Sequence, residues 1–277
     1  MLGSISIPEG DTLQVVCVVD GSTDGTLEML ARDFPAVHVV KGPGNWWYTR
    51  SMNEGFTYAV ENLSPDLVLS LNDDIEIRPD YLTSLVQAYQ QMGRDGLMGS
   101  ISLSVETPHT VTFSGTRSEG KFPYRWKPYI PMGLVDPKKL TGVYPTKELP
   151  GRGILVSAKV LQMLNFFDER FPQYHSDFDF CLRAAGKGIP VYVSYDSVVY
   201  SHVMQTSNST TFKKISTSGF LKNLINPYSR KHIGQNAYYI WRHKPKLLFP
   251  FFYTTWFLLL FVNHVKVNVF NKRSYGA

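Results

Sequence analysis

Residues 13–26, LQVVCVVDGSTDGT, decide the fold class of this 277-residue chain. A short apolar run rich in β-branched residues, from Leu13 to Val19, breaks at Asp20-Gly21-Ser22 and is followed by the helical pattern LEMLARDF. This order of patterns predicts a strand, a loop and a capped helix. The segment therefore indicates an α/β protein.

The same pattern recurs further along the chain. Strands are predicted at 37–40 and 67–71, and helices at 51–61 and after Pro79. Strands that alternate with helices predict a Rossmann-like, mainly parallel sheet flanked by helices, with ligands bound beyond the carboxyl ends of the strands. Residues 102–150 are rich in Gly, Pro and Tyr, which predicts loops and small strands, and 186–202 predicts a turn and two short strands.

Charge divides the chain into two regions. Residues 1–196 hold 17 Lys and Arg and all 23 Asp and Glu, a net charge of −6, whereas 197–277 hold 11 Lys and Arg and no acid, a net charge of +11. We therefore expect a catalytic domain over 1–202 and a basic extension over 203–277. Two distant cysteines exclude a disulfide framework, and the first residues lack an export signal, so a cytoplasmic location is expected.

Acidic side chains follow two of the predicted strands. Asn72-Asp73-Asp74 ends the strand at 67–71, and its oxygens suit Mg²⁺ or Mn²⁺, which bind through one or two carboxylates and substrate phosphates. The alternative is a turn in which these side chains cap the backbone. Asp20 is a candidate ligand-binding residue, and Asp24 is a candidate helix cap.

Two more acids precede a helix near the end of the predicted catalytic domain. Asp177 and Asp179 favour either a cap at that helix N-terminus or a general base. His202 follows the last predicted strand and is either structural or the residue that completes a site of carboxylate and phosphate oxygens.

Four segments in this order resemble a known family. They are VVDGSTDGT (18–26), GNWWYTRSMNEG (44–55), LSLNDDIEI (69–77) and GRGILVSAKVLQMLNFFDERFPQYHSDFDFCLRAAGKG (151–188). Together they resemble the inverting nucleotide-diphospho-sugar glycosyltransferases of the GT-A fold, specifically glycosyltransferase family 2 and its rhamnosyltransferase-like members. LSLNDDIEI matches the family's metal-binding DxD region, and Asn53 with Gly55 matches its N-x-G segment.

The resemblance implies a role for each candidate on the donor side. Asp20 would bind the nucleobase, while Asn53 and Asp73 would contribute to nucleotide-sugar binding. Asp74 with His202 would hold Mg²⁺ or Mn²⁺ on the diphosphate. Arg50 would add positive charge near the phosphates or lie on the surface.

On the acceptor side, the resemblance makes Asp177 the base that deprotonates the acceptor hydroxyl. Arg152 and Asp179 would lie near the acceptor, and Arg152 is equally compatible with a solvated surface position. The family has a Glu-Asp pair where this chain has Ser176-Asp177, so the Glu is lost and the Asp is kept.

Family members usually begin with a further strand and helix that form one wall of the nucleotide pocket. No such segment precedes the strand at 13–19 in the sequence given. A start codon assigned too late, a natural truncation, or partial replacement by LGSISIP (2–8) would each account for this. An absent central strand would reduce both stability and donor affinity.

The extension predicts contact with a membrane. An uncharged 16-residue run, LLFPFFYTTWFLLLFV (247–262), lies between basic segments. It is short for a spanning helix, and its aromatic residues and basic flanks favour a helix lying in the headgroup region of an anionic cytoplasmic leaflet. The alternative is a helix packed on the catalytic domain or on a partner. The long apolar block argues against a nucleic-acid partner.

The sequence thus predicts an inverting, metal-dependent glycosyltransferase at the cytoplasmic face of a membrane. Its donor would be a UDP- or dTDP-sugar, and its acceptor a saccharide or lipid-linked hydroxyl in surface polysaccharide biosynthesis. Two alternatives stay open: a non-catalytic membrane-associated subunit that has lost donor binding, and a GT-A-like nucleotidyltransferase.

Overall fold

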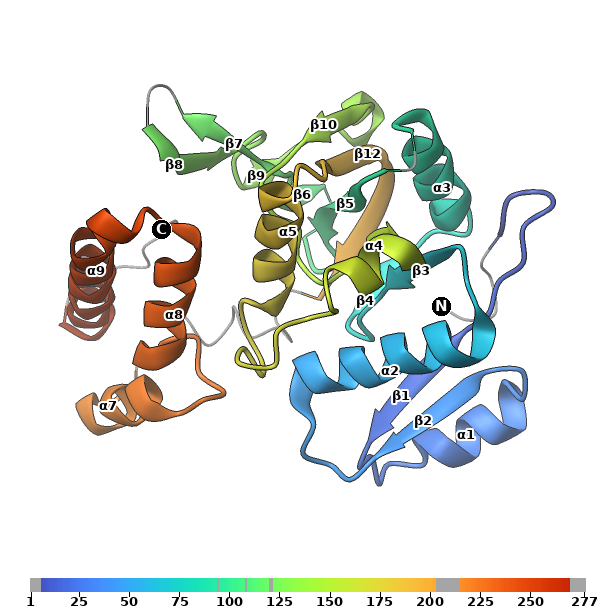
Figure 1. Ribbon diagram of the computed structural model, residues 1–277, viewed down its shortest axis with the longest axis horizontal. Coiled ribbons are helices and arrows are strands. Elements are labelled where there is room, and N and C mark those ends of the chain that lie inside the picture. The colour runs from blue at the N-terminus through green and yellow to red at the C-terminus, as the bar shows by residue number, and fades with distance from the viewer. Residues whose placement is uncertain (1–5, 94, 108, 120–121, 203–214, 270–277) are drawn as a thin grey trace.

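The strand–helix units at the start of the chain fold as the sequence predicts. The computed structural model describes residues 6–93, 95–107, 109–119, 122–202 and 215–269. The first elements are β1 (Val16–Asp20), α1 (Thr26–Asp33), β2 (His38–Gly42), α2 (Trp47–Leu63), β3 (Leu67–Ser70) and α3 (Tyr81–Gln91). β1 and β2 pair in parallel, and the helices alternate with the strands (Figure 1). The predicted α/β class is confirmed.

The larger sheet has eight strands, and most of its pairings are antiparallel. β5 (Leu97–Ser104) is buried along its whole length, and β12 (Val191–Ser201) runs parallel to it. The antiparallel pairs join β11 (Ile154–Ser157) to β3 and β5, β4 (Ile75–Ile77) and β10 (Val143–Pro145) to β12, and β6 (Thr110–Phe113) to β5 and β9 (Gly133–Leu134). The prediction of a mainly parallel sheet is therefore wrong, because apolar patterns locate strands without fixing their direction.

The pair β1–β2 lies apart from this sheet. Among the described residues, no ladder joins β1 to a strand other than β2. β1 and β3 both line one cavity of about 2720 Å³, and α2 contacts both strands. The carboxyl ends of β1 and β3 therefore open onto the same space, as the α/β pattern predicts.

A second correction concerns residues 191–201. These form one strand with a bulge between Ser194 and Val198, where two short strands were expected. The Ser194 hydroxyl accepts hydrogen bonds from the backbone N–H groups of Asp196 and Ser197, at 3.2 and 3.4 Å. Because these bonds stabilise the extra residues of the bulge, the strand continues on both sides of the kink.

The remaining elements surround the sheet. They are the hairpin β7 (Thr116–Glu119) and β8 (Phe122–Pro128), the 3₁₀ turns Pro137–Lys139 and Lys246–Leu248, and the helices α4 (Ala158–Met163), α5 (Ser176–Gly186), α7 (Thr217–Ile225), α8 (Ile233–His243) and α9 (Phe249–Val269). In Figure 1, α7, α8 and α9 form a separate group beside α5. The extension is therefore helical and lies next to the block that contains Asp177 and Asp179.

α9 is longer than the apolar run that predicts it. Its 21 residues have apolar side chains on all sides rather than on one face. By length and composition, Lys246–Asn268 could cross a membrane, and that window is not buried inside the protein. An interfacial helix should be polar on one side, so α9 differs from the predicted headgroup-region helix.

Candidate functional site

Asp177 lies at the N-terminal end of α5, on the wall of the cavity. Its two carboxylate oxygens accept hydrogen bonds from the backbone N–H groups of Gly151 and Phe178, each at 2.9 Å. Burial raises the pKa of Asp177 above the ordinary aspartate value, and the two N–H groups only partly oppose this effect. Asp177 is therefore a fixed carboxylate with raised basicity, which suits a general base.

Unsatisfied polar atoms accompany this carboxylate. Within the described part of the chain, seven buried side-chain atoms have no hydrogen-bond partner, and they include Tyr48 Oη, Asp74 Oδ1, His175 Nε2 and Ser176 Oγ. Tyr48, Asp74 and His175 also line the cavity. Because an unsatisfied buried polar atom costs about 1–3 kcal/mol, these atoms mark a place for a polar ligand with several hydroxyl or phosphate groups.

The backbones of Asp74 and His202 lie close together. The His202 N–H donates to the Asp74 carbonyl at 3.3 Å, and the His202 ring pairs with Glu76 at 3.0 Å. Within the described residues, no cluster of three or more His, Cys, Asp or Glu side chains could hold a metal ion. The orphaned Asp74 oxygen nevertheless fits the single carboxylate ligand that Mg²⁺ or Mn²⁺ often takes beside substrate phosphates.

Asp20 and Asp73 also line the cavity. Both oxygens of Asp20 accept hydrogen bonds from the loop between β2 and α2, from Gly44 N at 2.6 Å and Trp46 N at 2.7 Å. Asp73 is exposed. The structure thus brings both residues to the cavity. Asp20 also holds the loop between β2 and α2 in place.

Two predicted donor residues lie outside the cavity lining. The Asn53 side chain binds both backbone groups of Phe167, at 3.0 Å each, and therefore holds the segment before α5. Arg50 is exposed, pairs with Glu54 at 3.5 Å and lies over the Trp46 ring. Their hydrogen bonds explain their positions without a ligand, so we retain neither residue in the candidate site.

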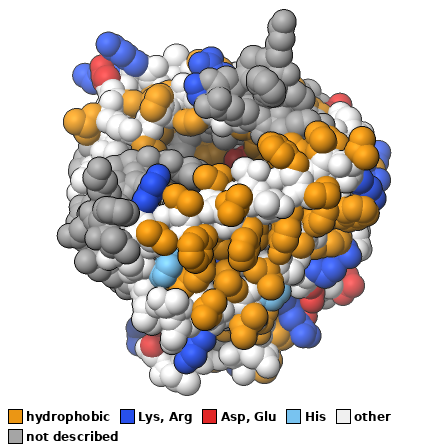
Figure 2. Space-filling model, turned by 90° about the vertical axis from the view of Figure 1, so that its left-hand side faces the viewer, with side chains coloured by type: hydrophobic (Ala, Val, Ile, Leu, Met, Phe, Trp, Pro, Cys, Tyr) orange, Lys and Arg blue, Asp and Glu red, His pale blue; other side chains and the backbone are white. Residues whose placement is uncertain are grey.

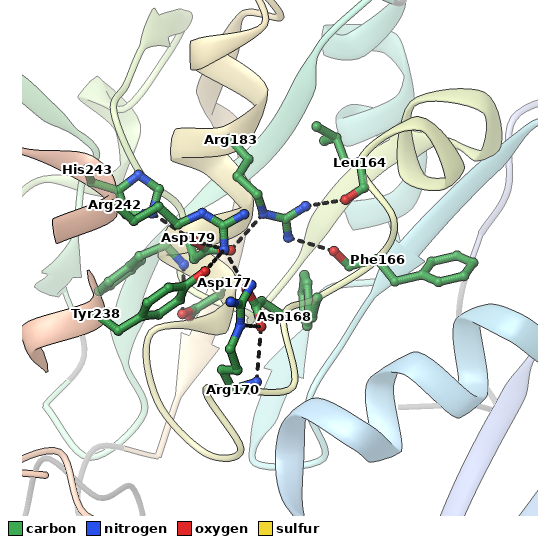
Figure 3. A network of polar contacts seen from close by, with 12 residues as sticks. Leu164, Phe166, Asp168, Arg170, Asp177, Asp179, Arg183, Tyr238, Arg242 and His243 are labelled. Atoms are coloured by element: carbon green, nitrogen blue, oxygen red, sulfur yellow. Dashed lines mark hydrogen bonds and ion pairs between the residues drawn. The ribbon is translucent and has the colours of Figure 1, made fainter. Parts of the chain in front are cut away.

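Asp179 faces the extension rather than the cavity. Its fully buried carboxylate accepts from Arg183 at 2.7 Å and His243 at 2.8 Å, with Arg242 at 3.3 Å (Figure 3). Arg242 also pairs with Asp168, which Arg170 binds from the other side. The predicted acceptor role of Asp179 is replaced by a structural one, because these ion pairs attach α8 to α5.

Arg152, the other predicted acceptor-side residue, lies in the cavity wall. Its guanidinium donates to the Ser201 hydroxyl at 2.6 Å, and its charge opposes the rise in the pKa of the nearby Tyr48. Arg152 is therefore a half-buried residue of the cavity wall, held by a hydrogen bond, and not a solvated surface residue.

The structure adds residues that the sequence did not indicate. Burial raises the pKa of Glu148 to about 7, and the charge of the neighbouring Asp177 adds to this rise. Burial lowers the pKa of His175 to about 4, with a further contribution from the Arg230 charge. Tyr239 of α8 stacks on His175 with a centroid distance of 4.9 Å. These residues come from distant segments, and only the uncommon acid Glu148 in a Gly- and Pro-rich stretch could have drawn attention.

Sequence comparison finds a matching family model and several relatives of this chain. Residues 5–140 match the model of the family described as glycosyl transferase family 2. A low-salt glycan biosynthesis hexosyltransferase of Haloferax volcanii, Agl10, is 24% identical over 63% of this chain. The dTDP-rhamnosyl transferase RfbF of Shigella flexneri is 22% identical over 84% of this chain and 73% of its own length. The match with the Haloferax protein spans about half of that protein, 54%.

Solved structures show the same fold at low sequence identity. GalNAc-T7, crystallised with UDP, GalNAc and Mn²⁺, has a TM-score of 0.53 and 13% identity, over 68% of this chain and 37% of that protein. Residues 1–349 of Staphylococcus aureus TarS in complex with UDP have a TM-score of 0.50 and 17% identity, over 87% of this chain and 65% of the other. The family match over residues 5–140 and the relatives support a family 2 glycosyltransferase, and the solved structures show the GT-A fold.

Proposed function

We propose that the protein is an inverting glycosyltransferase in surface polysaccharide biosynthesis. The donor is a UDP- or dTDP-linked hexose or deoxyhexose, and the acceptor is a hydroxyl of a saccharide or lipid-linked saccharide. The observation that carries the proposal is the Asp177 carboxylate, which is fixed in the wall of a cavity among unsatisfied polar atoms. The hexosyl- and rhamnosyltransferase relatives support the reaction class.

In this mechanism Asp177 accepts the proton of the acceptor hydroxyl while the oxygen of that hydroxyl attacks the anomeric carbon of the donor sugar. The new C–O bond forms on the face opposite the diphosphate, whose bond to the same carbon breaks with its electron pair, so the configuration inverts. Gly151 N–H and Phe178 N–H hold the carboxylate in one orientation. Since a single base suffices, the lost Glu beside Asp177 is not required for proton transfer.

Asp74, with His202, would hold a divalent cation on the donor diphosphate. Such a cation neutralises negative charge on the departing nucleoside diphosphate when it is bound. The orphaned Asp74 oxygen supports this assignment, and His202 would have to exchange its pairing with Glu76 for the cation. Asp20 and Asp73 line the same cavity and are the candidates for contacts with the nucleotide.

Product analysis tests the reaction class directly. Incubation of the full chain with UDP- and dTDP-sugars, Mn²⁺ and saccharide acceptors should yield a nucleoside diphosphate. Pyrophosphate release from a nucleoside triphosphate would instead show a nucleotidyltransferase. A well-folded sample that binds none of these donors would be a non-catalytic subunit, and the proposal would be wrong.

Replacement of Asp74 by Ala is expected to weaken Mn²⁺-dependent UDP binding about tenfold or more, because one charge-assisted ligand is lost. Titration calorimetry of UDP with and without Mn²⁺ measures this effect. The matched control is Asp80→Ala, which removes an exposed carboxylate that pairs with Arg78 at 3.6 Å. Equal UDP affinity of Asp74→Ala and Asp80→Ala in Mn²⁺ would contradict the metal role of Asp74.

We also propose that α9 attaches the protein to the cytoplasmic face of an anionic membrane. Figure 2 shows hydrophobic side chains gathered on one face of the molecule. On α9 the exposed ones include Phe251, Leu258, Leu259, Phe261 and Val262. A continuous apolar patch of this kind marks a membrane or protein interface, and the acid-free extension favours an anionic surface.

The double substitution Leu258→Gln with Phe261→Gln is expected to lower vesicle binding at least about 100-fold, because each buried apolar side chain contributes about 1.5–3 kcal/mol. Sedimentation with vesicles containing phosphatidylglycerol measures the bound fraction. Met132→Gln with Leu134→Gln is the control, since both residues are exposed on the catalytic domain, at 65% and 81%. Self-association without vesicle binding would show that α9 covers a partner instead.

A further inference from the structure

Two exposed aromatic rings line the cavity that contains Asp177. Trp47 is the first residue of α2, and Tyr228 lies in the turn before α8. The two rings stack on each other with a centroid distance of 3.9 Å and an angle of 17° between their planes. Trp47 is 44% exposed and Tyr228 is 36% exposed. A stacked pair with this exposure presents a flat and rigid surface on which a further ring can lie.

The same two rings belong to a second, smaller cavity of about 110 Å³. Trp47 and Tyr228 line both cavities, so the two spaces adjoin at the stacked rings. A ligand held at Asp177 can therefore continue over the rings into the second cavity. The other residues that line the second cavity are Asn45, Trp46, Thr49, Arg50, Glu169 and Pro172.

The second cavity combines aromatic rings with hydrogen-bonding groups. The half-buried Trp46 ring lies 5.5 Å from the Arg50 guanidinium, and the exposed side chains of Asn45 and Glu169 supply an amide and a carboxylate. A sugar has the matching surfaces, because its C–H groups suit the negative face of an aromatic ring and its hydroxyl groups suit amides and carboxylates. One cation and one carboxylate line this cavity, which favours a neutral ligand over a charged one.

The rings hold a fixed position relative to the candidate base. The Thr49 N–H donates to the Pro172 carbonyl at 3.0 Å, and the Tyr48 N–H donates to the Gln173 side chain at 3.2 Å. These two bonds attach the start of α2 to the segment that leads directly into α5 and Asp177. The stacked rings are thus preorganised beside the base, as a substrate subsite requires.

The backbone of Trp47 is strained in this position. Its φ is +58°, in the left-handed region that bulky side chains rarely adopt. The strained conformation occurs at the residue whose ring stacks on Tyr228 and lines both cavities. Backbone strain of this kind clusters at ligand sites, so the conformation of Trp47 agrees with a binding role for its ring.

We propose that Trp47 and Tyr228 form a subsite for a second sugar residue of the acceptor, with hydrogen bonds from the polar groups of the second cavity. The acceptor sugar itself lies at Asp177, and a neighbouring sugar of the same chain stacks on the two rings. The inference rests on the proposed function and adds a length requirement to it. A saccharide of two or more residues is preferred to a monosaccharide, which leaves the rings and the second cavity unoccupied.

Binding of the full chain to immobilised saccharides tests the subsite. The probes are mono-, di- and trisaccharides of rhamnose, glucose, galactose and N-acetylglucosamine. At least one oligosaccharide should bind about tenfold or more tightly than its constituent monosaccharides, because it alone contacts the rings. Trp47→Ala and Tyr228→Ala should each remove this preference and leave UDP affinity unchanged. The matched control is Trp241→Ala, which removes a ring of α8 that is also 44% exposed and that, within the described residues, lines neither cavity.

Three results would overturn the subsite. The first is equal binding of oligosaccharides and their monosaccharides, including no binding of either. The second is unaltered oligosaccharide affinity in Trp47→Ala and Tyr228→Ala. The third is a loss of UDP affinity in Trp47→Ala as large as its loss of saccharide affinity, which would assign the rings to the nucleobase.

A folding defect is distinguished from loss of the subsite by thermal unfolding of each variant. Trp47→Tyr keeps a ring at this position and should retain most of the affinity that Trp47→Ala loses. If Trp47→Ala does not fold, Tyr228→Ala, which changes an exposed turn residue, provides the decisive measurement.

The same samples separate this inference from the proposed function. Release of a nucleoside diphosphate at equal rates with monosaccharide and oligosaccharide acceptors would refute the subsite and leave the transferase proposal standing. Ring-dependent binding of an oligosaccharide without consumption of any nucleotide-sugar would do the reverse.

Discussion

Replacement of Asp177 by Asn should lower turnover by about 10²–10⁴-fold, the usual contribution of a general base, while UDP affinity stays nearly unchanged. The amide keeps a hydrogen-bond acceptor for the Gly151 or Phe178 N–H but cannot take the acceptor proton. Initial rates of nucleoside diphosphate release, together with UDP titrations, measure the two effects separately. Turnover within a fewfold of the unaltered chain would exclude Asp177 as the base.

The pH dependence provides a second readout for Asp177. Burial raises its pKa in the folded state, so the base is protonated and the rate falls at a higher pH than for an exposed aspartate. The raised pKa also means that ionisation of Asp177 costs stability as pH rises through the interval between its unfolded and folded pKa values. The stability of Asp177→Asn relative to the unaltered chain should therefore increase across that interval, whereas a merely structural carboxylate paired with a cation would show the opposite sign.

Replacement of Asp179 by Ala is expected to lower the free energy of unfolding by about 3–5 kcal/mol, the cost of leaving buried charges without their partner. The change removes the carboxylate that Arg183, His243 and Arg242 share between α5 and α8 (Figure 3). Urea unfolding followed by circular dichroism measures the loss.

Asp33→Ala is the matched control for Asp179, because it breaks an exposed ion pair with Arg32 and should leave the free energy of unfolding nearly unchanged. A loss below about 1 kcal/mol for Asp179→Ala as well would show that the buried network does not hold α8 in place. Because α8 carries Tyr239 against His175, turnover of Asp179→Ala should fall together with stability, whereas Asp177→Asn loses turnover alone.

The contrast between these two aspartates shows a limit of sequence reasoning. Asp177 and Asp179 share residue type, local charge and position in the first turn of α5. Residues two apart on a helix point about 200° away from each other, so only one of them can face the cavity. Which one does so depends on where α8 lies, and the partners in α8 are more than 60 positions away in the sequence.

Asn53 and Tyr48 show a related limit of sequence reasoning. Asn53 matches a family motif, yet its amide is fully engaged with Phe167 and Glu169, more than 110 positions away. Conversely, the sequence did not single out Tyr48. Its hydroxyl lies buried in the cavity wall without a hydrogen-bond partner, which makes it a candidate for contact with a ligand. A motif identifies residue types. The hydrogen-bond partners of those side chains are decided by the packed structure.

The sequence by itself determined the local elements and the family: the alternation of short apolar runs with helical patterns, the acids at strand ends and the acid-free extension are properties of neighbouring residues. Only the tertiary structure decided the direction of strand pairing, the separation of Asp177 from Asp179, and the position of Arg230 and Lys231 in the wall of the cavity that contains Asp177. The physical reason is the range of the interactions. Strand and helix patterns depend on a few consecutive side chains, whereas sheet pairing, buried ion pairs and shared cavities join residues that are close only after the whole chain has packed.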